Sequence, residues 1–120
     1  MLGKKISGGR YRKARKRKLY ERKGQKREVI LGKEKKKEIR VRGGKFKKVL
    51  LKADKVNVFD PKTKKCKVVA IKNVLEVPSN KFLVRKKVLV KGAVIETELG
   101  KARITNRPSQ EASVQAVLID

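Results

Sequence analysis

Short runs in which apolar and polar residues alternate dominate the chain from about residue 29 onward. In 37–42, for example, Ile39 and Val41 alternate with charged residues, and a strand places such alternate side chains on one face. Runs of the same kind predict further strands at 46–53, 55–59, 66–71, 81–85, 87–91, 93–99, 101–105 and 113–119. Turn signals rich in Gly, Pro, Asn and Asp separate the runs, and no long amphipathic helix competes with them. The pattern predicts a mainly β fold, an antiparallel barrel or sandwich.

The turn at 100–101 predicts the register of one hairpin. With these two residues as the loop, Glu98 lies opposite Arg103, and the two form a cross-strand ion pair worth about 0.2–1 kcal/mol. The neighbouring pairs follow the same register: Leu99 with Ala102 and Thr97 with Ile104. The inner face of the hairpin then carries Ala93, Ile95, Thr97, Leu99, Ala102 and Ile104. We expect this hairpin to be part of the scaffold.

A second hairpin is predicted around the glycine pair at 43–44. A two-residue loop there pairs Val41 with Phe46 and places Arg42 opposite Lys45. Like charges directly opposite one another are unfavourable, and a phosphate between them would remove the repulsion. The alternative is that both long side chains extend into water at little cost. Further lysines nearby favour the phosphate: Lys47, Lys48 and Lys52.

Charge divides the chain into two regions. The 120 residues include 37 Lys and Arg against 11 Asp and Glu, a net charge of +26. Residues 1–28 carry thirteen basic and two acidic side chains, whereas 53–120 carry a net charge of only +7. We therefore expect a basic arm at 1–28 and a β-barrel domain at 29–120. The 10–22 stretch has good helix formers but dense like charges at helical spacing, so it is expected to become ordered only when it binds RNA. A short helix within the stretch is compatible with this expectation.

The net charge also points to a polyanionic partner, because a compact chain with this charge repels itself. Nucleic acid, an anionic membrane face and heparin-like polymers all qualify. No run approaches the roughly 18 apolar residues of a membrane span, and the basic start of the chain lacks the apolar region of a secretory signal. Cys66 stands alone, which suits a reducing compartment. We expect a cytoplasmic protein without a membrane partner.

Catalysis is disfavoured by the residue types that the chain lacks. It contains no His and one Cys, so neither the usual near-neutral acid–base group nor a transition-metal cluster of ordinary spacing can form. Its early glycines match neither a P-loop nor a dinucleotide fingerprint. We expect no enzyme, no metal, no cofactor and no small-molecule substrate. An active site built on Asp, Glu, Lys or Tyr alone is the alternative.

Candidate contacts with a polyanion are richest in the arm. The pair Gly8 and Gly9 allows close approach of backbone to phosphate, and Tyr11 and Tyr20 could stack on bases or pack on the domain. A basic run can also be a solvated tail or a localisation signal. Cys66 is expected to be a small core residue rather than a reactive thiol, because it alternates with apolar neighbours. Three aromatic residues are also expected in the core: Phe46, Phe59 and Phe82.

Four stretches resemble a known family. They read SGGRYRKARKRKLYE at 7–21, VRGG at 41–44, KGAVIETELGKARITNRP at 91–108 and VQAVLI at 114–119. In this order they are similar to the eukaryotic-type small-subunit ribosomal protein number eight family, in its short archaeal form. Ser7 stands where the family usually has Thr, and Ser109 and Ala112 stand where it usually has Gly.

The resemblance implies a compact β-barrel with a basic extension, bound to small-subunit ribosomal RNA beside neighbouring ribosomal proteins and monomeric within the ribosome. The phosphate-contacting arm of the family maps onto Gly8, Gly9, Arg10, Arg12, Lys13, Arg15, Lys16, Arg17 and Lys18. We expect further arm contacts from Lys4, Lys5, Ser7, Tyr11 and Arg22. In the domain we expect contacts from Arg40, Arg42, Gly43, Gly44, Lys45, Lys47, Lys48, Arg85, Lys86 and Arg107, although 85–87 could equally be a solvated turn. The alternatives are a ribosome-assembly factor or RNA chaperone, and a DNA-compacting chromatin protein.

Overall fold

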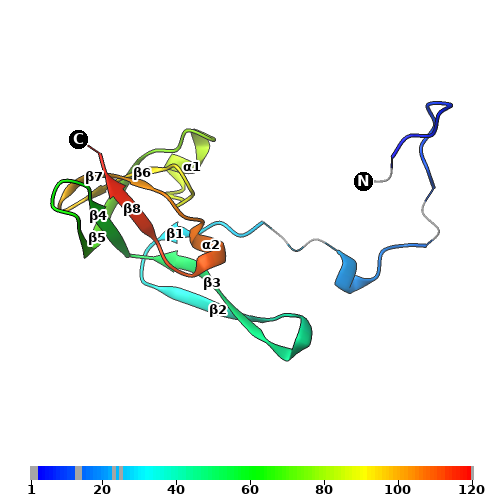
Figure 1. The fold of residues 1–120 in the computed structure, drawn as a ribbon, viewed down its shortest axis with the longest axis horizontal. Helices are drawn as coiled ribbons and strands as arrows, with labels where there is room; N and C mark the ends of the chain where they lie inside the picture. Colours follow the sequence, from blue (N-terminus) through cyan, green and yellow to red (C-terminus); the bar gives the residue numbers. More distant parts are fainter. Residues whose placement is uncertain (1–2, 13–14, 23, 25, 120) are drawn as a thin grey trace.

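The computed structural model describes residues 3–12, 15–22, 24 and 26–119. Five strands form a closed barrel in the order β4-β5-β6-β7-β8 (Figure 1). They are β4 (Lys55–Asp60), β5 (Lys65–Glu76), β6 (Val94–Thr97), β7 (Gly100–Ile104) and β8 (Gln115–Leu118). Neighbouring strands are antiparallel except β4 and β8, which pair in parallel and close the barrel. The predicted mainly β fold and small barrel are therefore confirmed, with one parallel pair.

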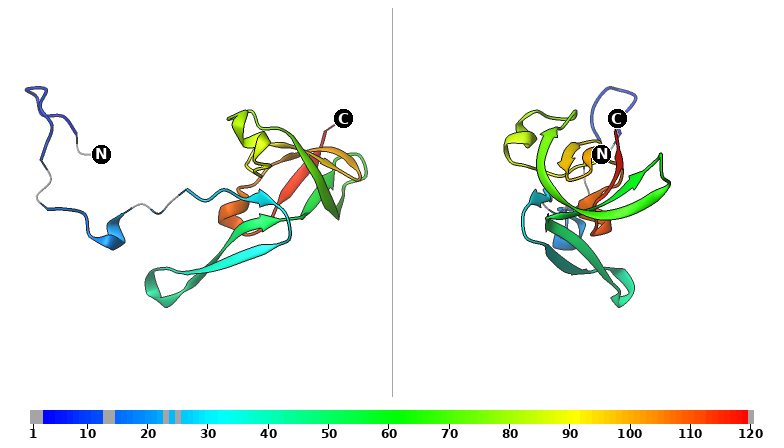
Figure 2. Two further views of the ribbon diagram at one scale, coloured as in Figure 1. Left: turned by 180° about the vertical axis from the view of Figure 1, so that it is seen from behind. Right: turned by 90° about the vertical axis from the view of Figure 1, so that its left-hand side faces the viewer.

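Three further strands form a separate sheet in the order β1-β3-β2. They are β1 (Ile30–Leu31), β2 (Lys35–Arg40) and β3 (Phe46–Ala53). The β2–β3 hairpin extends away from the barrel in every view (Figures 1 and 2). The far end of β3 leads directly into β4, and Leu50 and Ala53 near that end are buried in the barrel's core. One end of the hairpin is therefore anchored, whereas the tip is surrounded by solvent.

Alternating inward side chains fill the barrel. In β4, Val56 and Val58 are each 1% exposed, whereas their neighbour Asn57 faces outward. The other strands contribute further inward residues, including Ile95, Ala102, Ile104 and Ala116. In β5 a register irregularity interrupts the alternation, and Ile71 and Val74, three residues apart, both face the core. Residues outside the barrel strands complete the cluster, including Val29, Leu83, Val88 and Leu89. Burying such side chains contributes about 1.5–3 kcal/mol each, so the core stabilises the fold despite the positive charge outside it.

The predicted strands at 81–85 and 87–91 are wrong. Residues 82–85 form the short helix α1 (Phe82–Arg85), with Leu83 buried. The next segment has only an isolated bridge from Val88 to Ile30, and the Leu89 N–H donates to the Val29 carbonyl at 2.7 Å. Val88 and Leu89 are consecutive and both buried, which is incompatible with a strand that has one exposed face. A second short helix, α2 (Pro108–Glu111), occupies the expected loop, and its first residue is proline, a favoured position.

The predicted register of the β6–β7 hairpin is also wrong. Thr97 pairs with Gly100 and Glu96 with Lys101, so the loop residues are 98–99 and no Glu98–Arg103 pair forms. Gly100 has a φ of +121°, which glycine adopts readily after a two-residue loop. The Thr97 hydroxyl donates to the Gly100 carbonyl at 2.8 Å. The predicted inner face is confirmed except at Leu99, which is 42% exposed because it lies in the turn.

Ala112 ends α2 in the left-handed region, with a φ of +57°. The resemblance leads one to expect glycine at this position. An L-residue in this conformation costs about 1 kcal/mol relative to glycine, because its Cβ crowds the backbone. The alanine therefore keeps the turn geometry at a cost in stability.

Candidate nucleic-acid interface

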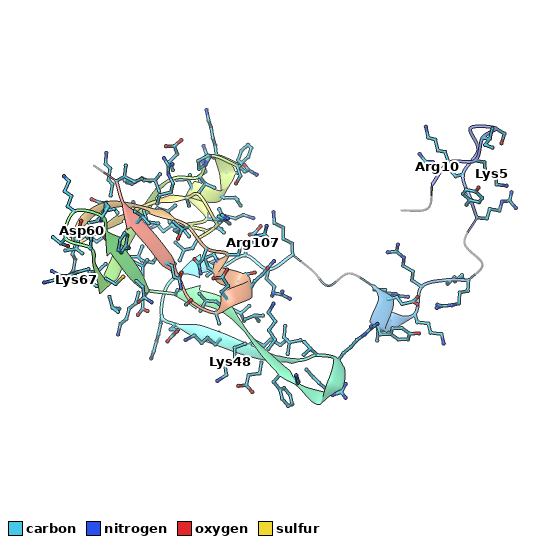
Figure 3. The ribbon with its side chains drawn as sticks, in the orientation of Figure 1. Lys5, Arg10, Lys48, Asp60, Lys67 and Arg107 are labelled. Atoms are coloured by element: carbon cyan, nitrogen blue, oxygen red, sulfur yellow. The ribbon has the colours of Figure 1, made fainter. Side chains whose placement is uncertain are left out.

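The described residues between 3 and 24 lie away from the barrel, with exposed side chains (Figure 1). A tight turn is formed near the start of this segment, where the Lys5 N–H donates to the Gly9 carbonyl at 2.7 Å and Gly8 has a φ of +82°. Lys4 and Arg10 bridge across this turn. Figure 3 shows Lys5 and Arg10 on its two sides. The Lys5 ammonium is 5.7 Å from the centroid of the Tyr11 ring, so a cation and an aromatic face lie together.

One arm cation is already paired. The Arg15 guanidinium donates to both carboxylate oxygens of Glu21, at 2.9 and 2.6 Å, around the single 3-10 turn η1 (Leu19–Glu21). The hydrogen bond from Arg15 holds the pKa of Glu21 below its ordinary value, helped by the Lys18 backbone N–H. A phosphate at Arg15 must therefore displace or share this carboxylate. Tyr20 beside it is 73% exposed and does not pack on the barrel.

The other predicted arm residues are exposed wherever the structure describes them. Lys13 lies outside the described residues. The remaining arm cations form no ion pair with a described acidic residue: Lys4, Lys5, Arg10, Arg12, Lys16, Arg17, Lys18 and Arg22. The sequence is compatible with a short helix within 10–22, and the structure has a single 3-10 turn there, η1. The like charges along this stretch explain why its described residues, 10–12 and 15–22, form no longer helix.

The β2–β3 hairpin carries the second group of predicted residues. Its register differs from the prediction by one residue: Arg40 pairs with Phe46, and the Val41 N–H donates to the Lys45 carbonyl at 2.8 Å. The tip is a 3-10 turn, η2 (Arg42–Gly44), so Arg42 does not lie opposite Lys45 as predicted. The tip carries two glycines at positive φ, +75° and +71° for Gly43 and Gly44, and a Cβ at either position would have no atom within 4 Å.

The shifted register places one pair of opposite charges across the middle of the hairpin, while Lys35 lies opposite Lys52 at its barrel end. Glu38 pairs with Lys48, and their charged groups are 3.6 Å apart. An exposed pair of this kind contributes about 0–1 kcal/mol. Four cations near the tip form no ion pair with any acidic residue that the structure describes: Arg40, Arg42, Lys45 and Lys47. Figure 3 shows Lys48 on the shaft of the hairpin, away from this tip.

All three phenylalanines contradict the prediction that they lie in the core. Phe46 is 69% exposed at the start of β3, Phe82 is 71% exposed on α1, and Phe59 is 38% exposed on β4. Cys66 is exposed as well, so its predicted core position is wrong. The strand register explains three of them: Phe59 and Cys66 are cross-strand partners on the outer face, and Phe46 lies at the hairpin tip beyond the core.

A third basic group was only partly predicted. A groove of about 390 Å³ is formed where 26–29 meets the barrel, and it brings Arg107 together with Lys26, Arg27 and Lys91. Figure 3 shows Arg107 beside the point where the N-terminal segment leaves the barrel. The sequence pattern indicated Arg107 alone, because these cations come from three separate segments. Arg85 and Lys86 lie elsewhere, at α1 and its C-terminal end, and Lys86 is 3.8 Å from the Glu28 carboxylate.

Asn106 holds Arg107 in place. The Asn106 side chain is nearly buried, donates to Glu111 and to the Ser113 carbonyl, and accepts from the Gln115 N–H, at 2.9–3.1 Å. The Arg107 N–H donates to the same Glu111 carboxylate at 3.3 Å. These bonds lower the pKa of Glu111, the Asn106 amide contributing most. The loop before α2 is therefore fixed by the sequence around Asn106 rather than by a ligand.

Two kinds of feature are absent from the residues that the structure describes. No helix among them is long and apolar enough to cross a membrane. No three of their Cys, Asp or Glu side chains gather in a way that could hold a metal ion.

The chain is a small, strongly basic β-barrel protein with a closed five-stranded barrel. Unpaired cations lie on the N-terminal segment, on the projecting hairpin and in the groove. The chain belongs to the ribosomal protein S8e family, whose model matches residues 2–119. This confirms the resemblance found in the sequence.

Archaeal relatives match the same chain. A small ribosomal subunit protein eS8 from Sulfurisphaera tokodaii is 39% identical over 117 residues, covering 97% of this chain and 91% of the relative. Relatives with the same name from Methanococcus aeolicus and Methanocella arvoryzae are 49% and 54% identical, over 59% and 58% of this chain. In both of these matches the aligned segment spans 56% of the relative's length, little more than half.

Proposed function

We propose that the chain is a structural constituent of the small ribosomal subunit, which binds folded small-subunit rRNA and stabilises it. The observation that carries this proposal is the grouping of unpaired cations on the N-terminal segment, the hairpin tip and the Arg107 groove. Membership of a ribosomal protein family supports it. The protein then works in the ribosome, beside neighbouring ribosomal proteins, without turnover of any substrate.

The arm, residues 1–28, neutralises phosphates where RNA helices pack closely. Releasing the counterions condensed on those phosphates supplies most of the affinity. The turn around Gly8 brings Lys4, Lys5 and Arg10 close together, and such a group of cations suits a phosphate rather than a base edge. Tyr11 and Tyr20, both exposed, are free to stack on unpaired bases.

The domain, residues 29–120, contributes a second set of contacts at the β2–β3 tip. The two glycines there remove side-chain bulk, so RNA backbone can approach the four flanking cations closely. Contacts of this kind follow the shape and the 2′-hydroxyl groups of RNA rather than its sequence. An arm and a hairpin that extend from one rigid barrel can bridge segments that are distant in the RNA chain.

Neutralising the hairpin tip tests the proposal. Replacing Arg40, Arg42, Lys45 and Lys47 with Gln is expected to weaken binding to full-length small-subunit rRNA and to reduce the slope of log K against log salt by about 3, since each phosphate contact contributes about 0.7–0.9. Fluorescence anisotropy at several salt concentrations measures both quantities. The matched control removes the same number of charges from the barrel, at Lys64, Lys65, Lys72 and Lys101. Equal losses in the two variants would show that net charge, and not the hairpin, determines binding.

A further inference from the structure

The outer face of β5, β4, β8 and β7 carries two rows of side chains that cross the strands in register. In the first row Phe59 pairs with Cys66 on one side and Val117 on the other, and Val117 pairs with Arg103. In the second row Asn57 joins Val68 and Gln115, and the Thr105 N–H donates to the Gln115 carbonyl. The strand residues between the rows, such as Val58 and Ala116, are buried in the barrel, so both rows face outward.

These rows line a hollow of about 530 Å³ on the barrel surface. Its floor is apolar: Phe59 is 38% exposed and Val68 is 66% exposed, with Val117 and Cys66 beside them. An exposed aromatic and aliphatic surface of this kind, grouped in one hollow, marks a binding site more often than isolated apolar residues do. Nothing in the described part of the chain covers it.

Polar groups without partners surround that floor. The side-chain amides of Asn57 and Gln115 make no hydrogen bond to any described residue, so each offers two donors and an acceptor. Arg103 ends the first row on the outer face, and Lys67, the partner of Val58 in the register, lines the hollow from the edge of β5. Neither forms an ion pair with a described acidic residue. Figure 3 shows Lys67 near the turn end of β4 and β5. The hollow therefore combines a stacking surface, free amides and cations.

We propose that this face binds unpaired bases of a single-stranded RNA segment. One base stacks on Phe59, the two amides hydrogen-bond to its exposed edge, and Lys67 and Arg103 contact the adjoining phosphates. The cations at the rim, in a chain of net charge +26, favour a polyanion over an apolar protein segment, which would leave the amides unpaired. This site is separate from the arm and the hairpin, and it adds recognition of single strands to the proposed binding of folded rRNA.

Cys66 provides a direct reporter, because it is the one cysteine of the chain and it lines the hollow. The rate of its alkylation by iodoacetamide is measured in the full chain, alone and with a single-stranded RNA of about eight nucleotides, a length typical of barrel-bound strands. A duplex RNA with the same number of phosphates is the matched probe. The single strand is expected to slow alkylation several-fold, and the duplex, held by charge elsewhere, is expected to leave the rate unchanged.

Two variants separate base stacking from general binding. Phe59→Ala is expected to abolish the protection of Cys66 by single strands, whereas Phe82→Ala, which removes an exposed phenylalanine from α1, is expected to retain it. Asn57→Ala combined with Gln115→Ala leaves the apolar floor intact. This double variant is expected to bind single strands but to lose any preference among the four bases.

Four outcomes would overturn the proposal. Cys66 could stay reactive while anisotropy shows that the single strand is bound, which would leave the proposed rRNA binding intact. Duplex and single strand could protect Cys66 equally, or protection could survive in Phe59→Ala. Protection could also arise only in assembled particles and persist after the RNA is digested, which would identify a protein as the occupant.

Discussion

Removing residues 1–28 is expected to abolish most of the affinity for small-subunit rRNA while the remaining barrel stays folded. The segment holds thirteen of the 37 basic residues, and the salt slope is expected to fall by about 0.7–0.9 for each phosphate that the arm no longer neutralises. Among the residues that the structure describes, Val29, 1% exposed, is the first to join the hydrophobic core, so the deletion is expected to leave that core intact. Anisotropy measures the affinity, and thermal unfolding followed by circular dichroism measures the fold.

A charge variant of the full-length chain is the matched control for this deletion. Replacing the arm's cations with Gln keeps its length, its glycine turn and its tyrosines, and is expected to reproduce most of the decrease in affinity. Unchanged affinity after the deletion would contradict the role of the arm. Unfolding of 29–120 would contradict the division of the chain into an arm and a domain.

The second large effect is expected in the barrel core. Ile95→Ala should lower the free energy of unfolding by about 2–5 kcal/mol, because Ile95 is fully buried and its removal leaves a cavity. Leu99→Ala should change it by no more than about 0.5 kcal/mol, because Leu99 lies in the β6–β7 turn, 42% exposed. Urea unfolding followed by circular dichroism measures both.

This pair of variants also tests the hairpin register. The register predicted from the sequence places Ile95 and Leu99 on the same inner face, whereas the observed register places only Ile95 there. Comparable losses of stability in the two variants would support the predicted register and contradict the observed one.

The alternation of side chains is enough to predict most of the strands. The runs at 46–53, 55–59 and 101–105 coincide with β3, β4 and β7 to within a residue, and the predicted inner face of 93–104 is correct except at Leu99. The closure of the barrel is not predictable in the same way. It depends on the parallel pairing of β4 with β8, which are more than fifty residues apart and carry no local signal for that contact.

Errors arise where local rules allow two outcomes. Hairpin loops at 43–44 and 100–101 fit the glycines, but a loop one or two residues earlier fits them as well and gives each strand better partners. Val88 and Leu89 are consecutive buried residues, and in the sequence such an apolar run is indistinguishable from a strand. β-Propensity does not distinguish an inner from an outer face, so it gives no means of placing the phenylalanines correctly.

The candidate site also has a part that can be predicted from neighbouring residues in the sequence and a part that cannot. Charge density and the glycine pairs are enough to indicate the arm and the hairpin tip as candidates, because those residues are neighbours in the sequence. Neither the groove that joins Lys26, Lys91 and Arg107 nor the rows around Phe59 could be predicted. Both consist of residues that only the folded barrel brings together.

The most direct test of the proposed function is co-sedimentation of the native protein from a lysate. The extract is prepared without nuclease, washed with about 0.5 M salt to strip loose electrostatic binding, and separated on a density gradient. A structural ribosomal protein is expected in near-stoichiometric amounts in mature small subunits and in translating ribosomes. Sedimentation with chromosomal DNA, or with immature particles alone, would contradict the proposed function and would favour the chromatin or assembly-factor alternative.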